Sequence, residues 1–149
     1  MQQLVYAMQF KSRAVPGEGQ PGVIHVRGDA ASSSITTIIN EGGLTGGFDP
    51  ASVATAHFES DVTMGSDGTF TEVGSITFGN GRNRVYFTTA GRGWMGQSPD
   101  PALKQGAVTW TVERGEGQFA GGGGVITSNF TLDEKGEVLD YHMGVLYIP

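Results

Sequence analysis

Three residues of this chain carry side chains suited to moving a proton, namely His57, Glu59 and His142. His57 and Glu59 are two positions apart, as are Asp140 and His142, so in an extended strand the members of each pair point to the same side. A carboxylate beside an imidazole orients the ring and raises its basicity, which a general base requires. We therefore take His57, Glu59 and His142 as the candidate catalytic residues.

Each pair also has a simpler interpretation, as ordinary surface. In the segment 54–64, His57 and Glu59 alternate with apolar residues, so they are solvated if the apolar side packs inward. In the segment 138–148, the residues Leu139, Tyr141, Met143, Val145 and Tyr147 form one face, which we interpret as core or as the wall of an apolar pocket. Asp140 and His142 then lie on the opposite face. Both alternatives stay open, because a register change of one residue exchanges the two faces.

Other kinds of chemistry have less support. A site of two histidines and one carboxylate would need His57, Glu59 and His142 to meet, with His25 as a further possible ligand. Ligand spacings such as His-x-His are missing, so we predict no metal site. Cysteine is absent, and no Gly-x-Ser-x-Gly elbow is present. We expect no cofactor, and any enzyme activity would be that of a cofactor-independent isomerase, cyclase or lyase.

Aromatic and apolar side chains are numerous enough to line a pocket for a small, largely apolar molecule. Trp110 alternates with Val108 and Val112, which indicates a core anchor. Arg84 and Tyr86 share a strand face and could hold an anionic or carbonyl group. The predicted ligand-binding residues are Tyr6, Met8, Phe58, Arg84, Tyr86, Trp110 and Tyr141.

These residues must be positioned by strands, because the chain shows no amphipathic helical pattern. About nine strand-like runs are separated by Gly-, Pro- and Asp-rich breaks: 4–10, 22–28, 34–40, 54–64, 69–78, 84–89, 106–113, 125–132 and 138–148. Residues 41–50 are expected to form a flexible loop and 91–101 an irregular stretch. Sequential antiparallel strands favour one all-β domain over residues 1–149, an antiparallel β-barrel of about eight to nine strands. A two-sheet sandwich is the alternative.

Composition and charge exclude several classes of partner. The net charge of −6, with no cluster of the nine Lys and Arg, argues against nucleic acid. The first ten residues do not resemble a signal peptide, and no apolar run has membrane-spanning length, so we expect a cytoplasmic protein without a membrane partner.

The segment from Gly115 to Phe130 is the most distinctive. Its Gly-x-Gly-x-Phe-Ala-Gly-x-x-Gly pattern, Gly115 to Gly124, leads into a strand. It resembles the signature of the allene oxide cyclase-like barrels, nearest to small bacterial families of unknown function. The resemblance implies an allene oxide cyclase-like or calycin-like barrel and carries over no catalytic residue. In physical terms the glycines permit a corner with Phe119 packed inward as a plug, and a phosphate loop is excluded because no Lys-Ser/Thr ending or helix follows.

Two functions follow as expectations. The first is a barrel with a pocket for a small apolar molecule, whose acid–base groups could support cofactor-free proton transfer. The second is a packed, non-catalytic barrel that acts through self-association as a dimer or trimer. In that case the Trp94–Met95 pair on a glycine-flanked loop and the C-terminal segment 145–149 would be interface elements.

Overall fold

The computed structural model describes residues 1–149, in which nine strands form one antiparallel sheet. The strands are β1 (Gln2–Pro16), β2 (Val23–Asn40), β3 (Gly43–Met64), β4 (Thr69–Phe78), β5 (Asn83–Thr89), β6 (Gly93–Gln97), β7 (Leu103–Glu116), β8 (Gly123–Asp133) and β9 (Glu137–Ile148). The helical element η1 (Gly117–Phe119) is a single 3-10 turn. No helical segment has the length and hydrophobicity that crossing a bilayer would require.

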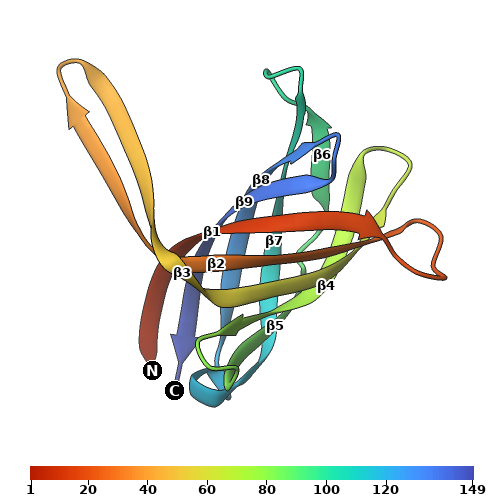
Figure 1. The fold of residues 1–149 in the computed structure, drawn as a ribbon. Helices are drawn as coiled ribbons and strands as arrows, with labels where there is room; N and C mark the ends of the chain where they lie inside the picture. The colour runs from red at the N-terminus through yellow and green to blue at the C-terminus, as the bar shows by residue number, and fades with distance from the viewer.

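The sheet closes on itself because β3 pairs with β4 as well as with β2 (Figure 1). Around the ring the order is β3-β2-β1-β9-β8-β7-β5-β4, and β6 also bridges β7 and β4, next to β5. Strands β5 and β6 therefore both lie between β4 and β7 and together fill one position in the ring. The predicted all-β antiparallel barrel of eight to nine strands is confirmed, and closure leaves no open sheet edge in the ring.

Two segments expected to be irregular contain strands. Only Glu41 and Gly42 form the turn of the predicted loop 41–50, because Ile39 pairs with Leu44 and the ladder continues from there. The paired residues extend β2 and β3 into a hairpin arm that projects from the barrel (Figure 1). In the stretch 91–101, Gly93–Gln97 forms β6. Pro99 and Pro101 lie beyond its end, where they interrupt no ladder hydrogen bond.

The face prediction for the last strand was wrong. Asp140, His142 and Leu146 of β9 are buried in the barrel, whereas Tyr141 and Met143 are 39% and 53% exposed on the outside. The hydropathy pattern misleads here because the buried face carries polar groups that hydrogen-bond to each other, while the outer face carries no charge. Burying polar groups costs little when they are paired in this way.

One end of the barrel is closed by the glycine segment. Phe119 of η1 is buried against Phe78, with ring centroids 5.4 Å apart, and Phe78 packs on Tyr6. Gly117 has a φ of +64°, and a Cβ atom at Gly115 would collide with Phe119. The predicted corner with Phe119 as a plug is thus confirmed. Both chain termini lie at this closed end (Figure 1).

Candidate functional site

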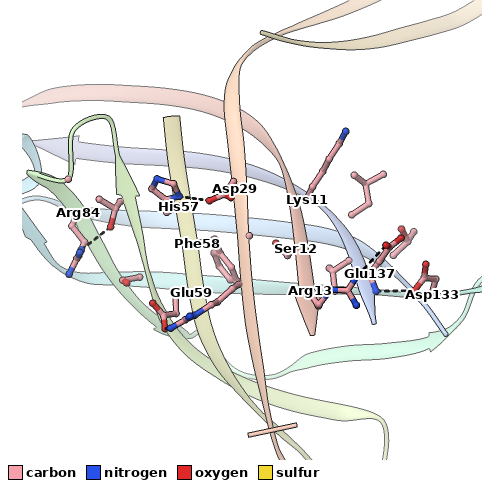
Figure 2. A pocket seen from close by; sticks show the side chains of 18 of the residues that line it. Lys11, Ser12, Arg13, Asp29, His57, Phe58, Glu59, Arg84, Asp133 and Glu137 are labelled. Carbon is pink, nitrogen blue, oxygen red and sulfur yellow. Dashed lines mark hydrogen bonds and ion pairs between the residues drawn. The ribbon is translucent and has the colours of Figure 1, made fainter. Parts of the chain in front are cut away.

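His57 and Glu59 lie on the outer wall of the barrel, away from its interior. The register of β2 with β3 places Asp29 opposite His57, Arg27 opposite Glu59 and His25 opposite Asp61. His57 Nδ1 contacts Asp29, and Arg27 donates to Glu59 through Nε at 3.2 Å and Nη2 at 2.8 Å. Figure 2 shows His57 beside Asp29 on the outside of these strands. This row of solvated ion pairs matches the surface interpretation, and each exposed pair contributes little to stability.

His142 lies inside the barrel and does not meet the other two candidates. Its Nε2 is 2.9 Å from Oδ2 of Asp140, and the Ser128 hydroxyl donates to Oδ1 of the same carboxylate at 2.6 Å. Because Asp140 accepts, Nε2 carries a proton, while the buried Nδ1 has no hydrogen-bond partner. The predicted Asp140–His142 pair therefore forms in the interior. The set of His57, Glu59 and His142 does not come together.

An aromatic layer surrounds the imidazole and fills the middle of the barrel. The ring of His142 packs on Phe10 at 4.5 Å, on Trp110 at 4.9 Å and on Phe58 at 5.3 Å between centroids. Phe87 stacks on Trp110 at 4.3 Å. Trp110 is fully buried, as its alternation with valines predicted. This layer separates the closed end of the barrel from the other end.

A second buried carboxylate, Glu72, was missed by the sequence analysis. The Ser60 hydroxyl donates to its Oε1 at 2.6 Å, and Trp110 Nε1 donates to its Oε2 at 3.0 Å. A signal was available, because Glu72 alternates with Phe70, Gly74 and Ile76 on the inward face of β4. A single acid on an otherwise apolar strand face indicates a buried carboxylate, which must have a compensating function or partner.

The two carboxylates are positioned by equivalent hairpins. In the β3–β4 turn, Asp67 accepts from the Thr69 amide at 3.0 Å, and in the β8–β9 turn Asp133 accepts from the Lys135 and Glu137 amides at 2.8 and 2.9 Å. Such side-chain hydrogen bonds hold tight turns and so fix the strand register. The hydrogen bonds from Thr69 lower the pKa of Asp67, and that from the Glu137 amide lowers the pKa of Asp133.

Burial decides the ionisation of Glu72. Desolvation raises the pKa of Glu72 to about 7, the negative charge of Asp140 also raises it, and the hydrogen bonds from Ser60 and Trp110 act in the opposite direction. A carboxyl group with a pKa near neutral pH can both give and take a proton under cellular conditions. Glu72 therefore has the acid–base property that the sequence predicted for His57 and Glu59.

Glu72 and Asp140 line an apolar cavity at the open end of the barrel. The cavity has a volume of about 70 Å³, and its other lining residues include Val26, Val62, Met64, Phe70, Met95 and Phe130. It lies between the aromatic layer and the β1–β2, β3–β4 and β8–β9 turns. An engineered apolar cavity of roughly 150 Å³ binds benzene, so a ring-sized ligand needs some side chains to move. Met64 and Met95 can do so, since methionine has three flexible torsions.

Some of the predicted ligand-binding residues lie inside the barrel, and the others lie on its outer surface. Phe58 lines the cavity. Tyr6 and Met8 pack against the core, and burial raises the pKa of the Tyr6 phenol, whose hydroxyl has no partner. Trp110 holds Glu72 from the aromatic layer. Arg84, Tyr86 and Tyr141 lie on the outer surface, where Arg84 donates to Thr77 at 2.9 Å and Tyr141 packs on Phe48.

Comparison with known proteins adds information on the fold. No protein-family model matches the chain, and no curated protein matches it. Among solved structures, it is similar to one described as the pterocarpan synthase dirigent protein GePTS1, with a TM-score of 0.55 and 15% sequence identity. That match covers 100% of this chain and 88% of the other. At this identity the likeness concerns the barrel fold, which it supports over the whole chain.

Proposed function

We propose that this barrel binds a small, largely apolar molecule at its open end and transfers protons on it without a cofactor. The observation that carries the proposal is the position of Glu72 and Asp140, two buried carboxylates at the floor of an apolar cavity. An apolar site with few convergent polar groups is the usual form of a small-molecule pocket. A reaction of the isomerase, cyclase or lyase type would suit these groups.

Glu72 is the proposed acid–base residue. When ionised, its carboxylate can take a proton from a carbon next to a carbonyl group, and when protonated it can return the proton to another atom of the same molecule. Asp140 contributes the negative charge that helps to keep the pKa of Glu72 near 7. His142 does not line the cavity, and we assign it a positioning role through its contact with Asp140.

We further propose that the chain is a distant member of the allene oxide cyclase-like barrels. The glycine segment from Gly115 and the structural likeness to a dirigent barrel support this placement. That neighbour is described both as a dirigent protein and as a pterocarpan synthase. This association supports a search for chemistry in the present barrel, although it names no substrate for it.

A ring-sized ketone tests the proposal. In deuterated buffer, NMR would follow the exchange of the α-protons of cyclopentanone, with wild-type protein compared with Glu72→Gln. We expect faster exchange with the wild type, and a rate that rises with pH through about 7 as Glu72 ionises. Equal exchange rates for the two proteins would overturn the catalytic role of Glu72.

Binding is measured separately from catalysis. Amide chemical shifts of residues around the cavity should change on addition of cyclopentanone, and Val62→Phe should abolish the change because Val62 lines the cavity. Thr63→Phe is the matched control, since Thr63 is the neighbouring, outward-facing residue of β3. If cyclopentanone shifts no cavity amide even in the wild type, the pocket is rejected. The filled aromatic layer then favours the packed, non-catalytic barrel.

A further inference from the structure

The interior of the barrel contains two acidic side chains and no lysine or arginine. Its buried polar residues are Ser60, Glu72, Ser128, Asp140 and His142. No basic side chain other than His142 is buried, and none lines the cavity. Buried carboxylates in proteins are normally paired with a positive charge. Here both carboxylates line one cavity, and the protein places no lysine or arginine beside them.

His142 does not supply the missing positive charge. Its Nε2–H already donates to Asp140, so a second proton would have to lie on Nδ1. Nδ1 is buried without a hydrogen-bond partner, and an unpaired buried charge of this kind is costly. Tyr6, at the closed end, stays neutral because burial raises the pKa of its phenol. The buried titratable groups around Glu72 therefore cannot balance its charge.

The basic side chains at the open end are engaged outside the cavity. Arg92 donates to the Thr69 hydroxyl at 2.7 Å, and its positive charge acts on Asp67. Arg13 lies 3.5 Å from Glu137. Both arginines are exposed to solvent and neither lines the cavity. The positive charge that would match the two carboxylates must therefore come from a ligand.

The walls of the cavity suit a cationic ligand in two ways. An ionised carboxylate offers about four lone-pair sites, and the hydrogen bonds in the structure occupy two on Glu72 and two on Asp140. Phe58, Phe70 and Phe130 also line the cavity, and aromatic rings attract cations. An ammonium group has three N–H donors and a positive charge, so it can satisfy both the carboxylates and the rings.

We propose that the molecule bound in this cavity is a small apolar amine in its protonated form, whose ammonium group pairs with Glu72 and Asp140. This inference rests on the proposed function, because it names the class of molecule that the same cavity takes. The carboxylates lose their hydration when the chain folds, so only the ammonium group must be desolvated on binding. A neutral molecule of the same shape gains no such ion pair and binds more weakly.

Binding of the ammonium group should release a proton from Glu72. Burial and the charge of Asp140 raise the pKa of Glu72 to about 7, and a positive charge beside the carboxylate favours its ionised form. The ligand thus converts Glu72 into the form that can act as a base. Because the ligand pairs with ionised Glu72, its apparent affinity follows the ionised fraction and should rise about tenfold from pH 6 to pH 8.

Titration calorimetry on the wild-type protein tests the proposal with cyclopentylammonium and its neutral isostere cyclopentanol. An alkylamine stays protonated in this range, as lysine does, so the pH dependence comes from the protein. We expect the ammonium to bind more tightly than the alcohol at pH 8. At pH 6 its binding should release about one proton, measured from the heats in two buffers of different ionisation enthalpy. Equal affinities of the two ligands at pH 8, or binding without proton release, would overturn the proposal.

Two variants with the same change in net charge locate the site. Glu72→Gln should abolish the proton release and the pH dependence of cyclopentylammonium binding. Glu113→Gln is the matched control, because Glu113 is an exposed residue of β7 that does not line the cavity, and it should change neither quantity. If Glu113→Gln weakens binding as much as Glu72→Gln, the ammonium is attracted by the overall charge of −6, and the proposal is wrong.

Failure of this inference can be distinguished from failure of the proposed function. If cyclopentanone shifts the cavity amides and cyclopentylammonium does not bind, the amine is rejected and the proposed pocket stands. If cyclopentylammonium binds with proton release and the α-protons of cyclopentanone do not exchange, the amine is supported and the catalytic role of Glu72 is rejected.

Discussion

Glu72 and Asp140 face the same cavity, and each accepts a hydrogen bond at 2.6 Å from a serine that precedes it by twelve residues. The second oxygen of each carboxylate contacts a ring nitrogen, Trp110 Nε1 for Glu72 and His142 Nε2 for Asp140. The environments thus match in hydrogen bonding, and burial together with the nearby charge of Asp140 raises the pKa of Glu72. Like charges in one apolar site favour protonation of one partner.

Trp110 should report the ionisation of Glu72 through its fluorescence. Its indole donates directly to Oε2 of Glu72, so the charge on that carboxylate should change the emission. Trp94→Phe removes the second tryptophan, which is exposed on the outer wall. In that background we expect an emission change with a midpoint near pH 7. Adding Glu72→Gln should remove the transition, and a transition that persists would assign it to another group.

Two further substitutions should move that midpoint in opposite directions. Asp140→Asn removes a negative charge that raises the pKa of Glu72, so the midpoint should fall. Ser60→Ala removes a hydrogen bond that lowers the pKa of Glu72, so the midpoint should rise. Both are measured by the same fluorescence titration in the Trp94→Phe background. Shifts of the same sign would show that general loosening of the core, and not these contacts, sets the pKa.

The free energy of unfolding should decrease with rising pH because of Glu72. Its folded-state pKa of about 7 exceeds the unfolded value of 4.5, so between these values the folded state binds more protons. The stabilising effect is complete below about pH 4.5 and is lost as pH rises through 7, by on the order of 3 kcal/mol.

Urea denaturation of wild type and Glu72→Gln at several pH values measures this difference. The lowered pKa values of Asp67 and Asp133 act below this window, where their stabilisation is lost as pH falls. They are also common to both proteins. A constant difference in stability between wild type and Glu72→Gln from pH 4.5 to 7 would contradict the assignment.

Gly144 is required for close packing of two strands. A Cβ atom there would overlap the ring of Tyr6, which is wedged between β9 and Phe78. We expect Gly144→Ala to destabilise the protein by about 1–3 kcal/mol, as overpacking usually does. Thermal unfolding measures the effect. Gly123→Ala is the control, because a Cβ there meets only Val112 O at 3.5 Å, and equal losses would exclude the steric explanation.

The sequence was a good guide to the barrel and a partial guide to its site. The breaks at 65–68 and 133–137 identified the β3–β4 and β8–β9 hairpins, and Trp110 and Phe119 were recognised as buried. The face of β9 was assigned in reverse, because Tyr141 and Tyr147 have the hydropathy of core residues but lie outside. The alternation on β4 was a local signal for the burial of Glu72 that went unused. Its hydrogen-bond partners, Ser60 and Trp110, are 12 and 38 residues away along the chain and are not visible in a local pattern.

The proposed pocket is closed at its inner end by the aromatic layer, which includes Phe58, Phe87, Trp110 and His142. Behind this layer, Phe119 of η1 closes the barrel itself. A molecule that enters must leave by the same mouth. Product would therefore occupy the only route of the next substrate, and its inhibition would be competitive. Turnover would then depend on how readily Met64 and Met95, at the mouth, move aside for departure.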